Sequence, residues 1–231
     1  MCTARSSVVL ALLAVLCTGA AATGHKPVSI GGSYPTFDEA LRITDIDVSQ
    51  VAYVELSETE RALWLAFEAT AGTHLDVSLG LPVLDRLADS RPTLAVLGPG
   101  LPAIVLPFET PQGVGGVAFE TSAVAKPRFF HEPFTGTDSW IPLEESLDLP
   151  ETGTYYVVAW PPGEPIDKLW VAIGVRERFG LRDILAMPRI VRDVRAFHEV
   201  PVRPGGGIVG KLLFLGLAAA LIGALVAWAR T

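Results

Sequence analysis

The stretch LDLPETGTYYVVAW, residues 147–160, carries the clearest signal of the fold. Leu147 and Leu149 alternate with polar residues and end one predicted strand. Residues 150–153 supply the Pro and Gly of a turn, and residues 154–160 are β-branched or aromatic except for Ala159, which favours a second strand. Two such runs joined by a short turn predict a β-hairpin.

Short apolar segments with the same character occur on both sides of this hairpin, and turn residues separate them. The predicted strands cover residues 51–56, 62–67, 75–79, 93–97, 103–108, 117–121 and 169–173. Strands and helices do not alternate along the chain, so nothing in the sequence indicates a parallel sheet. Many short strands between Gly- and Pro-rich turns are typical of an antiparallel sandwich, so we expect a mainly β domain over residues 25–176.

Two motifs resemble a known family. The sequences TGTYYVVAW, residues 152–160, and KLWVAIG, residues 168–174, resemble the last strands of the pre-peptidase carboxy-terminal type of bacterial β-sandwich. Residues 63–79, with an Ala-Gly-Thr turn between two strands, resemble the same family. The resemblance implies a jelly-roll-like ectodomain. Modules of this family flank secreted enzymes and mostly bind or assist, so it also implies a non-enzymatic role.

The two ends of the chain are apolar and predict its location. Residues 208–229 contain a single Lys and match the roughly 20 helical residues that cross a bilayer, which predicts one transmembrane helix and a cytoplasmic tail, residues 230–231. Residues 1–24 have the composition of a signal peptide. We therefore expect a single-pass protein of the cell membrane, with its amino terminus and ectodomain on the periplasmic or extracellular side. A processed sorting signal is the alternative for the C-terminal segment.

Residues 177–199 change to a helical period, with apolar side chains on one side and arginines on the other. Pro188 is expected to kink or split this amphipathic juxtamembrane helix. Residues 200–207 would link it to the transmembrane helix. Two interpretations stay open: the helix packs on the sandwich, or it lies on the membrane with its arginines facing lipid phosphates.

Charge and cysteine content exclude several classes of function. Three of the 18 basic residues and none of the 25 acidic ones lie in the two ends, so the ectodomain has a net charge of −10 and is not expected to bind nucleic acid. Both cysteines, Cys2 and Cys17, fall in the predicted signal peptide, which excludes a disulfide framework and a thiol nucleophile. No motif of a hydrolase, zinc protease or phosphate loop is present, and we expect no enzymatic activity.

The densest cluster of polar and aromatic residues is FFHEPFTGTDSW, residues 129–140, interpreted as one loop. His131, Glu132, Asp138 and Trp140 are its candidate ligand-binding residues, because an aromatic ring beside carboxylates suits a sugar. His131 and Glu132 also suit a metal. The alternative is a structural loop whose aromatic residues enter the core.

His25 adds a second hypothesis. Cleavage of the signal after Gly24 would make His25 the first residue, whose amine and imidazole chelate copper, with His131 as a further ligand. Two functions follow. The first is a membrane-anchored exoplasmic binding module, or an accessory subunit of a membrane-protein complex, with no cofactor. The alternative is a periplasmic copper-binding protein.

Overall fold

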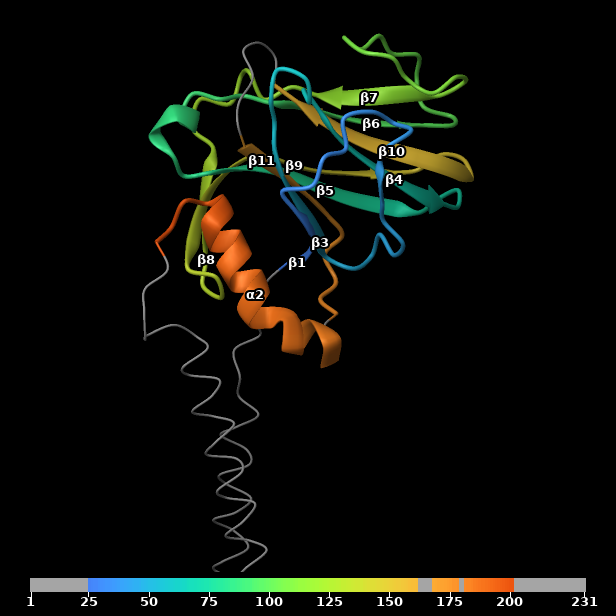
Figure 1. Cartoon of the computed structure of the whole chain (residues 1–231). Helices are drawn as coiled ribbons and strands as arrows, with labels where there is room; N and C mark the ends of the chain where they lie inside the picture. Colours follow the sequence, from blue (N-terminus) through green and yellow to red (C-terminus); the bar gives the residue numbers. More distant parts are fainter. Residues whose placement is uncertain (1–24, 162–167, 179–180, 202–231) are drawn as a thin grey trace, which may run out of the picture.

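Two β-sheets pack face to face in the computed structural model, which describes residues 25–161, 168–178 and 181–201 (Figure 1). The first, sheet A, has the strand order β1-β3-β11-β5-β9-β8, and the second, sheet B, has the order β2-β4-β10-β6-β7. The mainly β sandwich predicted from the sequence is confirmed.

The described strands alternate repeatedly between the two sheets along the chain. Their bounds are β1 Lys26–Ile30, β2 Leu41–Arg42, β3 Gln50–Glu55, β4 Leu63–Ala69, β5 His74–Pro82, β6 Thr93–Gly98, β7 Gly115–Phe119, β8 Arg128–Glu132, β9 Thr137–Asp148, β10 Gly153–Trp160 and β11 Lys168–Ile173. A 3₁₀ turn, η1, covers Asp85–Leu87, and helix α2 covers Leu181–Phe197.

The sheets are mixed, so the prediction of a purely antiparallel sandwich is wrong. β1 pairs with β3 in parallel, and β2 pairs with β4 in parallel, while the other strand pairs are antiparallel. The chain passes through β2 in sheet B between β1 and β3 of sheet A. A connection of that length lets β3 return beside β1 in the same direction, which a tight hairpin forbids.

The predicted hairpin at residues 147–160 is instead a connection between the sheets. β9 belongs to sheet A and β10 to sheet B, so the two strands flank the turn without pairing. The turn between β4 and β5 likewise connects a strand of sheet B to a strand of sheet A. The two turns bond to each other, since the Gly72 amide donates to the Leu149 carbonyl at 2.7 Å and the Leu149 amide donates to the Thr73 carbonyl at 2.9 Å.

Two further sequence interpretations need correction. Residues 103–108 form no strand; with neighbouring residues of the same segment they cover the outer face of sheet B, where Phe108 packs edge-on against Trp64. Residues 129–140 are not one loop but a β-hairpin of β8 and β9. Gly136, with φ of 64°, occupies the left-handed conformation in its turn, which suits a residue without a Cβ.

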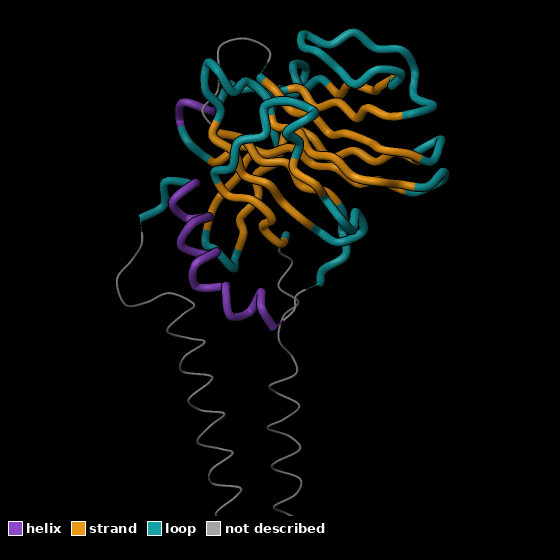
Figure 2. The backbone as a smooth tube through the Cα atoms, turned by 45° about the vertical axis from the view of Figure 1, so that its right-hand side comes forward, coloured by secondary structure: helices purple, strands orange, loops and turns teal. Residues whose placement is uncertain are grey.

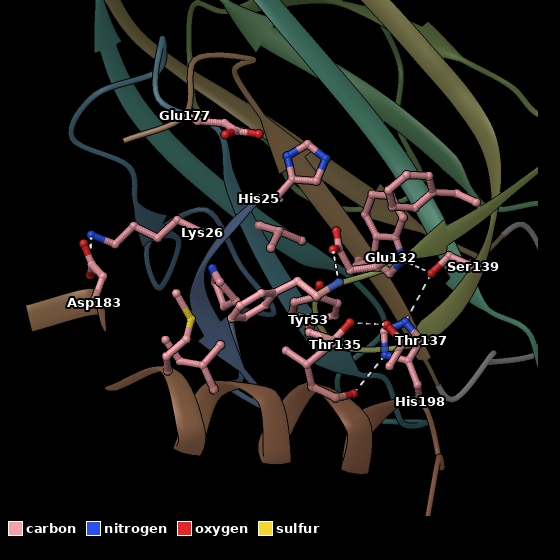
Figure 3. A pocket seen from close by; sticks show the side chains of 18 residues that line it. His25, Lys26, Tyr53, Glu132, Thr135, Thr137, Ser139, Glu177, Asp183 and His198 are labelled. Carbon is pink, nitrogen blue, oxygen red and sulfur yellow. Dashed lines mark hydrogen bonds and ion pairs between the residues drawn. The ribbon is translucent and has the colours of Figure 1, made fainter. Parts of the chain in front are cut away.

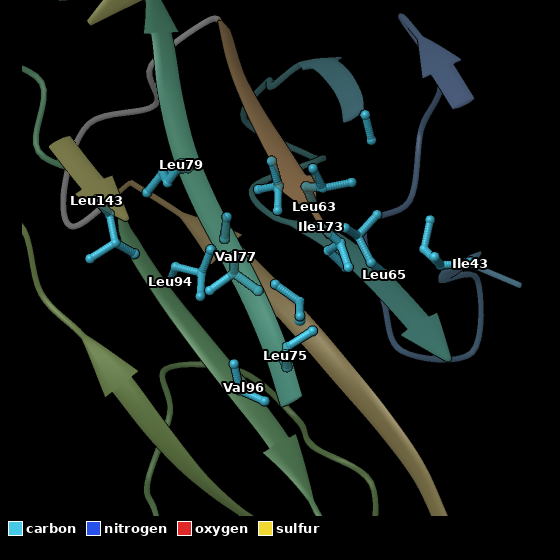
Figure 4. Close-up of a cluster of buried hydrophobic side chains, with 14 of the residues drawn as sticks. Ile43, Leu63, Leu65, Leu75, Val77, Leu79, Leu94, Val96, Leu143 and Ile173 are labelled. Carbon is cyan, nitrogen blue, oxygen red and sulfur yellow. The ribbon is translucent and has the colours of Figure 1, made fainter. Parts of the chain in front are cut away.

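The main core lies between the sheets and is formed by alternate residues of strands from both (Figure 4). Tyr155 of β10 is fully buried, stacks on Phe67 and donates its hydroxyl hydrogen bond to backbone carbonyls of Pro99 and Glu151. Because these hydrogen bonds offset the cost of removing the hydroxyl from water, a ring of this size can occupy the interior.

Helix α2 covers the outer face of sheet A (Figure 2). Val194 and Phe197 are buried against the sheet, whereas Leu185 is 82% exposed. The interpretation in which this helix packs on the sandwich is therefore confirmed. Pro188 lies inside one helix, so it does not split α2 into two.

Within the described residues, no helix is long and apolar enough to cross a membrane. The predicted signal peptide, residues 1–24, and the predicted transmembrane helix, residues 208–229, lie outside the described residues, as does most of the linker.

Candidate functional site: a pocket between helix α2 and sheet A

A pocket of about 290 Å³ lies between α2 and the outer face of sheet A (Figure 3). Strand alternation builds its floor, because every second side chain of a strand points away from the core. On β3, Ala52 and Val54 belong to the core between the sheets, whereas Val51 and Tyr53 line the pocket. The helix supplies the roof through Met187, Ile190 and Val194.

Trp170 of β11 anchors this floor. Its indole lies directly on the backbone of Gly80, where a Cβ would come within about 2.0 Å of the ring. It is 4% exposed and shares a cluster with Val51 and Phe197. Because Gly80 has no side chain, the large ring can lie flat against the neighbouring strand.

A chain of hydrogen bonds joins the floor to the roof. Trp170 Nε1 donates to Ser139 Oγ at 3.2 Å, and His198 Nδ1 lies 2.9 Å from the Val194 carbonyl. Since that carbonyl only accepts, Nδ1 carries the proton and Nε2 accepts from Ser139 Oγ at 3.1 Å. The chain is complete when His198 is neutral, and burial lowers the pKa of His198 to about 4.

Ionic contacts attach the C-terminal end of α2 to the sandwich. Lys168 of β11 is buried and donates to the Phe197 carbonyl and to Glu199, both at 2.9 Å. Glu199 also accepts from Arg86, and these two cationic partners lower its pKa to about 2. Arg195 donates to the Thr135 carbonyl at 2.8 Å, in the β8–β9 turn. The helix is thus fixed over the pocket at its C-terminal end.

The buried histidine makes stability depend on pH. Its pKa is lower in the folded state, so the unfolded chain binds more protons between pH 6.5 and about 4, and folding is disfavoured there. We expect acidification from pH 7 to pH 5 to remove on the order of 2 kcal/mol of unfolding free energy through His198. Urea titration at both pH values measures it. The raised pKa of Glu132 opposes this trend, and the lowered pKa of His25 adds to it.

The control for this prediction is a second histidine. His198→Gln is expected to flatten the dependence between pH 5 and pH 7, while His131→Gln, which changes an exposed side chain, keeps it. An unchanged slope in His198→Gln would show that other groups cause the acid sensitivity.

Glu132, Tyr53 and His25 are among the polar residues that line the mainly apolar pocket. The Glu132 carboxylate accepts one hydrogen bond, from the Phe134 amide at 2.9 Å, and burial raises its pKa. Burial also raises the pKa of Tyr53, whose hydroxyl makes no hydrogen bond to any described residue. Burial lowers the pKa of His25, which keeps its imidazole neutral. The lining therefore combines apolar walls with a few hydrogen-bonding groups.

The sequence-predicted site residues divide between the two faces of sheet A. His131 pairs with Asp138 and Trp140 with Phe129 across the β8–β9 hairpin, with His131 Nδ1 2.6 Å from the Asp138 carboxylate. Glu132 is next to His131 in the strand, so it points to the opposite face and into the pocket.

His25 also lines the pocket, but His131 does not, so the structure does not bring the two candidate copper ligands together there. Across the described ranges, no three or more His, Cys, Asp or Glu side chains form a group suited to a metal ion. Whether His25 begins the mature chain depends on residues 1–24, which the structure does not describe.

Several residues of the pocket were not among the site residues predicted from the sequence. Tyr53, Ser139, Trp170 and His198 come from three strands and the end of α2. Alternation within β3 and β11 marks Tyr53 and Trp170 as outward-facing, and the amphipathic pattern of α2 provides an apolar cover for that face. Only the order of strands in sheet A shows that these residues meet.

Comparison with known proteins gives distant similarities only. No protein-family model matches the chain, and no curated protein matches it. Among solved structures, the pre-peptidase C-terminal domain of a collagenase from Bacillus anthracis is similar at 11% identity and a TM-score of 0.30, covering 58% of this chain and 92% of that domain. The secreted copper-binding protein MopE of Methylococcus capsulatus is similar at 10% identity and a TM-score of 0.28, covering 66% of this chain and 100% of that chain. The resemblance to the pre-peptidase C-terminal type of sandwich seen in the sequence motifs is thus found again, as a loose one.

Proposed function

We propose that the protein is a non-enzymatic, membrane-anchored binding module on the exoplasmic side, and that it binds a small, mostly apolar ligand in the pocket beneath α2. The same placement suits an accessory subunit that presents this ligand to a membrane-protein complex. The observation that carries the proposal is the pocket itself, because an amphipathic helix packed on a flat sheet usually fills the space between them.

The lining has the composition of a ligand site. Small-molecule pockets are concave, mainly apolar and supplied with a few polar groups that orient the ligand. The volume of about 290 Å³ is near the lower end of their usual range, roughly 300–1,000 Å³, and suits a single alkyl chain or a small ring system. Glu132, Tyr53 and His25 are among its polar groups.

The predicted tether would hold this face of the sandwich near the bilayer. The first and last described elements meet at the pocket, because residues of the edge strand β1 and of α2 both line it. The predicted transmembrane helix begins ten residues after His198, which lines the pocket, and ten residues span at most about 36 Å. An apolar ligand that leaves or enters a membrane would find the pocket within that distance, which supports a role at the membrane surface.

A fluorescence titration tests the proposal. The full chain in phosphatidylcholine nanodiscs is titrated with N-phenyl-1-naphthylamine, a neutral dye that brightens in apolar surroundings, and the signal of empty nanodiscs is subtracted. We expect saturable binding of one dye per chain. Ile190→Trp places a large ring into the pocket from the roof and is expected to weaken binding at least about ten-fold.

The matched control uses the same helix. Leu185→Trp introduces the same ring at an exposed position and is expected to leave the titration unchanged. Urea unfolding of both variants verifies that they fold like the parent chain. Equal binding by Ile190→Trp and the parent, or the absence of saturable binding by the parent, contradicts a ligand site beneath α2.

A further inference from the structure

Strand β8 forms a free edge of sheet A, at the end of the strand order opposite β1 (Figure 1). The Glu132 carbonyl accepts a hydrogen bond from the Gly136 amide at 2.8 Å in the β8–β9 turn, so the backbone groups of residue 132 point toward β9. These groups alternate between the two sides of a strand, so the N–H and C=O groups of Phe129 and His131 point away from β9. No other described strand pairs with that side, and β8 contains no bulge, Lys or Pro, so its edge is open to a further strand.

The side chains of Phe129 and His131 make this edge partly apolar. Phe129 is 58% exposed and lies opposite Trp140 of β9, which is half-buried. The His131 imidazole lies 2.6 Å from the Asp138 carboxylate, so Asp138 offsets the charge of His131 when the imidazole is protonated. An exposed aromatic ring beside unpaired backbone groups is typical of a surface that another protein covers.

The sequence PRFFHEP around β8 is symmetrical in character about Phe130. Pro127 and Pro133 lie three residues to either side of it, and the oppositely charged Arg128 and Glu132 lie two residues to either side. Antiparallel pairing of two copies about Phe130 therefore places Arg128 of each copy opposite Glu132 of the other. Phe130 then lies opposite Phe130 of the second copy, which is a favourable aromatic pair. The strand is thus complementary to a second copy of itself.

The same register satisfies the backbone. It exchanges the outward N–H and C=O groups of Phe129 with those of His131 in the second copy. A register centred on Phe129 places Pro127 opposite His131, and a register centred on His131 places Pro133 opposite Phe129. Because Pro has no N–H, either shift leaves an outward carbonyl without a donor. The backbone and the charges therefore favour the same register.

The ion pair between copies can form without breaking the contacts that each chain already makes. Arg128 donates to Glu144 through Nε at 2.8 Å and Nη2 at 2.6 Å, which leaves both N–H groups of Nη1. Glu132 accepts from the Phe134 amide at Oε1, which leaves Oε2. Directly opposite Cβ atoms of paired strands are about 4.5–5.5 Å apart, so the long Arg128 side chain reaches Glu132 of the second copy.

We propose that two copies of this chain dimerise through β8, paired antiparallel about a two-fold axis between their Phe130 residues. The axis is perpendicular to the sheet, so sheet A of one copy continues into sheet A of the other and both outer faces point the same way. The pocket and α2 of each copy lie on that face, so the dimer suits two chains that are anchored in one membrane. Confinement to a bilayer raises the effective concentration, which favours an interface as short as one strand pair. The dimer requires no ligand, so this inference goes beyond the proposed binding function.

Disulfide cross-linking of the full chain in phosphatidylcholine vesicles tests the dimer. The chain carries Cys2→Ser and Cys17→Ser, so that Phe130→Cys provides its one thiol. Residues 130 of the two copies lie opposite each other, at a separation that a disulfide can bridge. We expect oxidised glutathione to give at least about five-fold more cross-linked dimer than in Val105→Cys, which is 96% exposed and measures random collision.

Reversal of single charges tests the register. In the Phe130→Cys background, Arg128→Glu places a glutamate opposite Glu132 of the second copy, and Glu132→Arg places an arginine opposite Arg128. Each variant alone is expected to cross-link no more than Val105→Cys. An equal mixture of the two variants restores opposite charges in a mixed dimer, and we expect it to recover at least about half of the cross-linking of Phe130→Cys.

A second pair of thiols gives a test that does not depend on the folding of Phe130→Cys. Phe129→Cys and His131→Cys change exposed side chains, and a mixture of these two chains is expected to cross-link at least about three-fold more than either chain alone. Equal cross-linking in the mixture and in the single chains would overturn the inference, as would a folded Phe130→Cys that cross-links only as much as Val105→Cys. Charge variants that cross-link like Phe130→Cys when alone, or that fail to recover when mixed, would also overturn it.

Discussion

Trp170→Ala is expected to lower the free energy of unfolding by about 3–5 kcal/mol, a large part of the 5–15 kcal/mol typical of a domain. The indole is 4% exposed, lies on the backbone of Gly80 and contacts the cluster that includes Phe197 of α2. Its removal leaves a cavity beneath the helix. It also removes the donor to Ser139 Oγ, at the start of the chain of hydrogen bonds that ends at His198.

Urea unfolding of the full chain measures this loss, and Trp170→Phe is the matched control. Phenylalanine keeps most of the ring volume but donates no hydrogen bond, so we expect it to cost about 1–2 kcal/mol. A loss below about 1 kcal/mol in Trp170→Ala would show that the indole does not support the packing of α2 on sheet A.

The positions of most strands followed from the sequence, but their partners did not. The alternation in residues 75–79 and the β-branched run at residues 154–160 predicted β5 and β10 correctly. Both strands enter the fold from a Gly- or Pro-containing turn that passes between the sheets. A turn of this composition serves equally in a hairpin and in a crossing between sheets, so local sequence could not distinguish them.

The sequence predicted only some residues of the candidate site correctly, and the geometry of a β-strand explains why the other predicted residues lie elsewhere. Glu132 and His25 line the pocket, but His131, Asp138 and Trp140 do not. Interpreting residues 129–140 as a loop allowed these side chains to converge. In a strand, His131 and Glu132 must point to opposite faces, and the Gly-containing turn at residues 133–136 was the signal that a hairpin was present.

The roof of the pocket could be predicted only as an apolar surface. The period of α2 showed that one side of the helix would be buried, without indicating what it would cover. Contacts between Lys168, Arg86 and Glu199 fix the end of the helix on sheet A. These residues are up to 113 positions apart in the chain, and no local pattern connects them.

The central claim is that a ligand lies between α2 and the outer face of sheet A, and quenching of Trp170 tests it most directly. The probe is 8-bromooctan-1-ol, which carries a quenching bromine and no charge. It is added to the full chain in phosphatidylcholine nanodiscs while tryptophan fluorescence is recorded. Trp170 is the described tryptophan that lines the pocket; Trp64 is buried in a cluster on the outer side of sheet B.

We expect a saturable loss of fluorescence in the parent chain and in Leu185→Trp. The saturable component should disappear in Trp170→Phe, which keeps the pocket but removes its fluorophore, and in Ile190→Trp, which fills the pocket. Saturable quenching that persists unchanged in Trp170→Phe would place the bound probe elsewhere on the molecule and contradict the account.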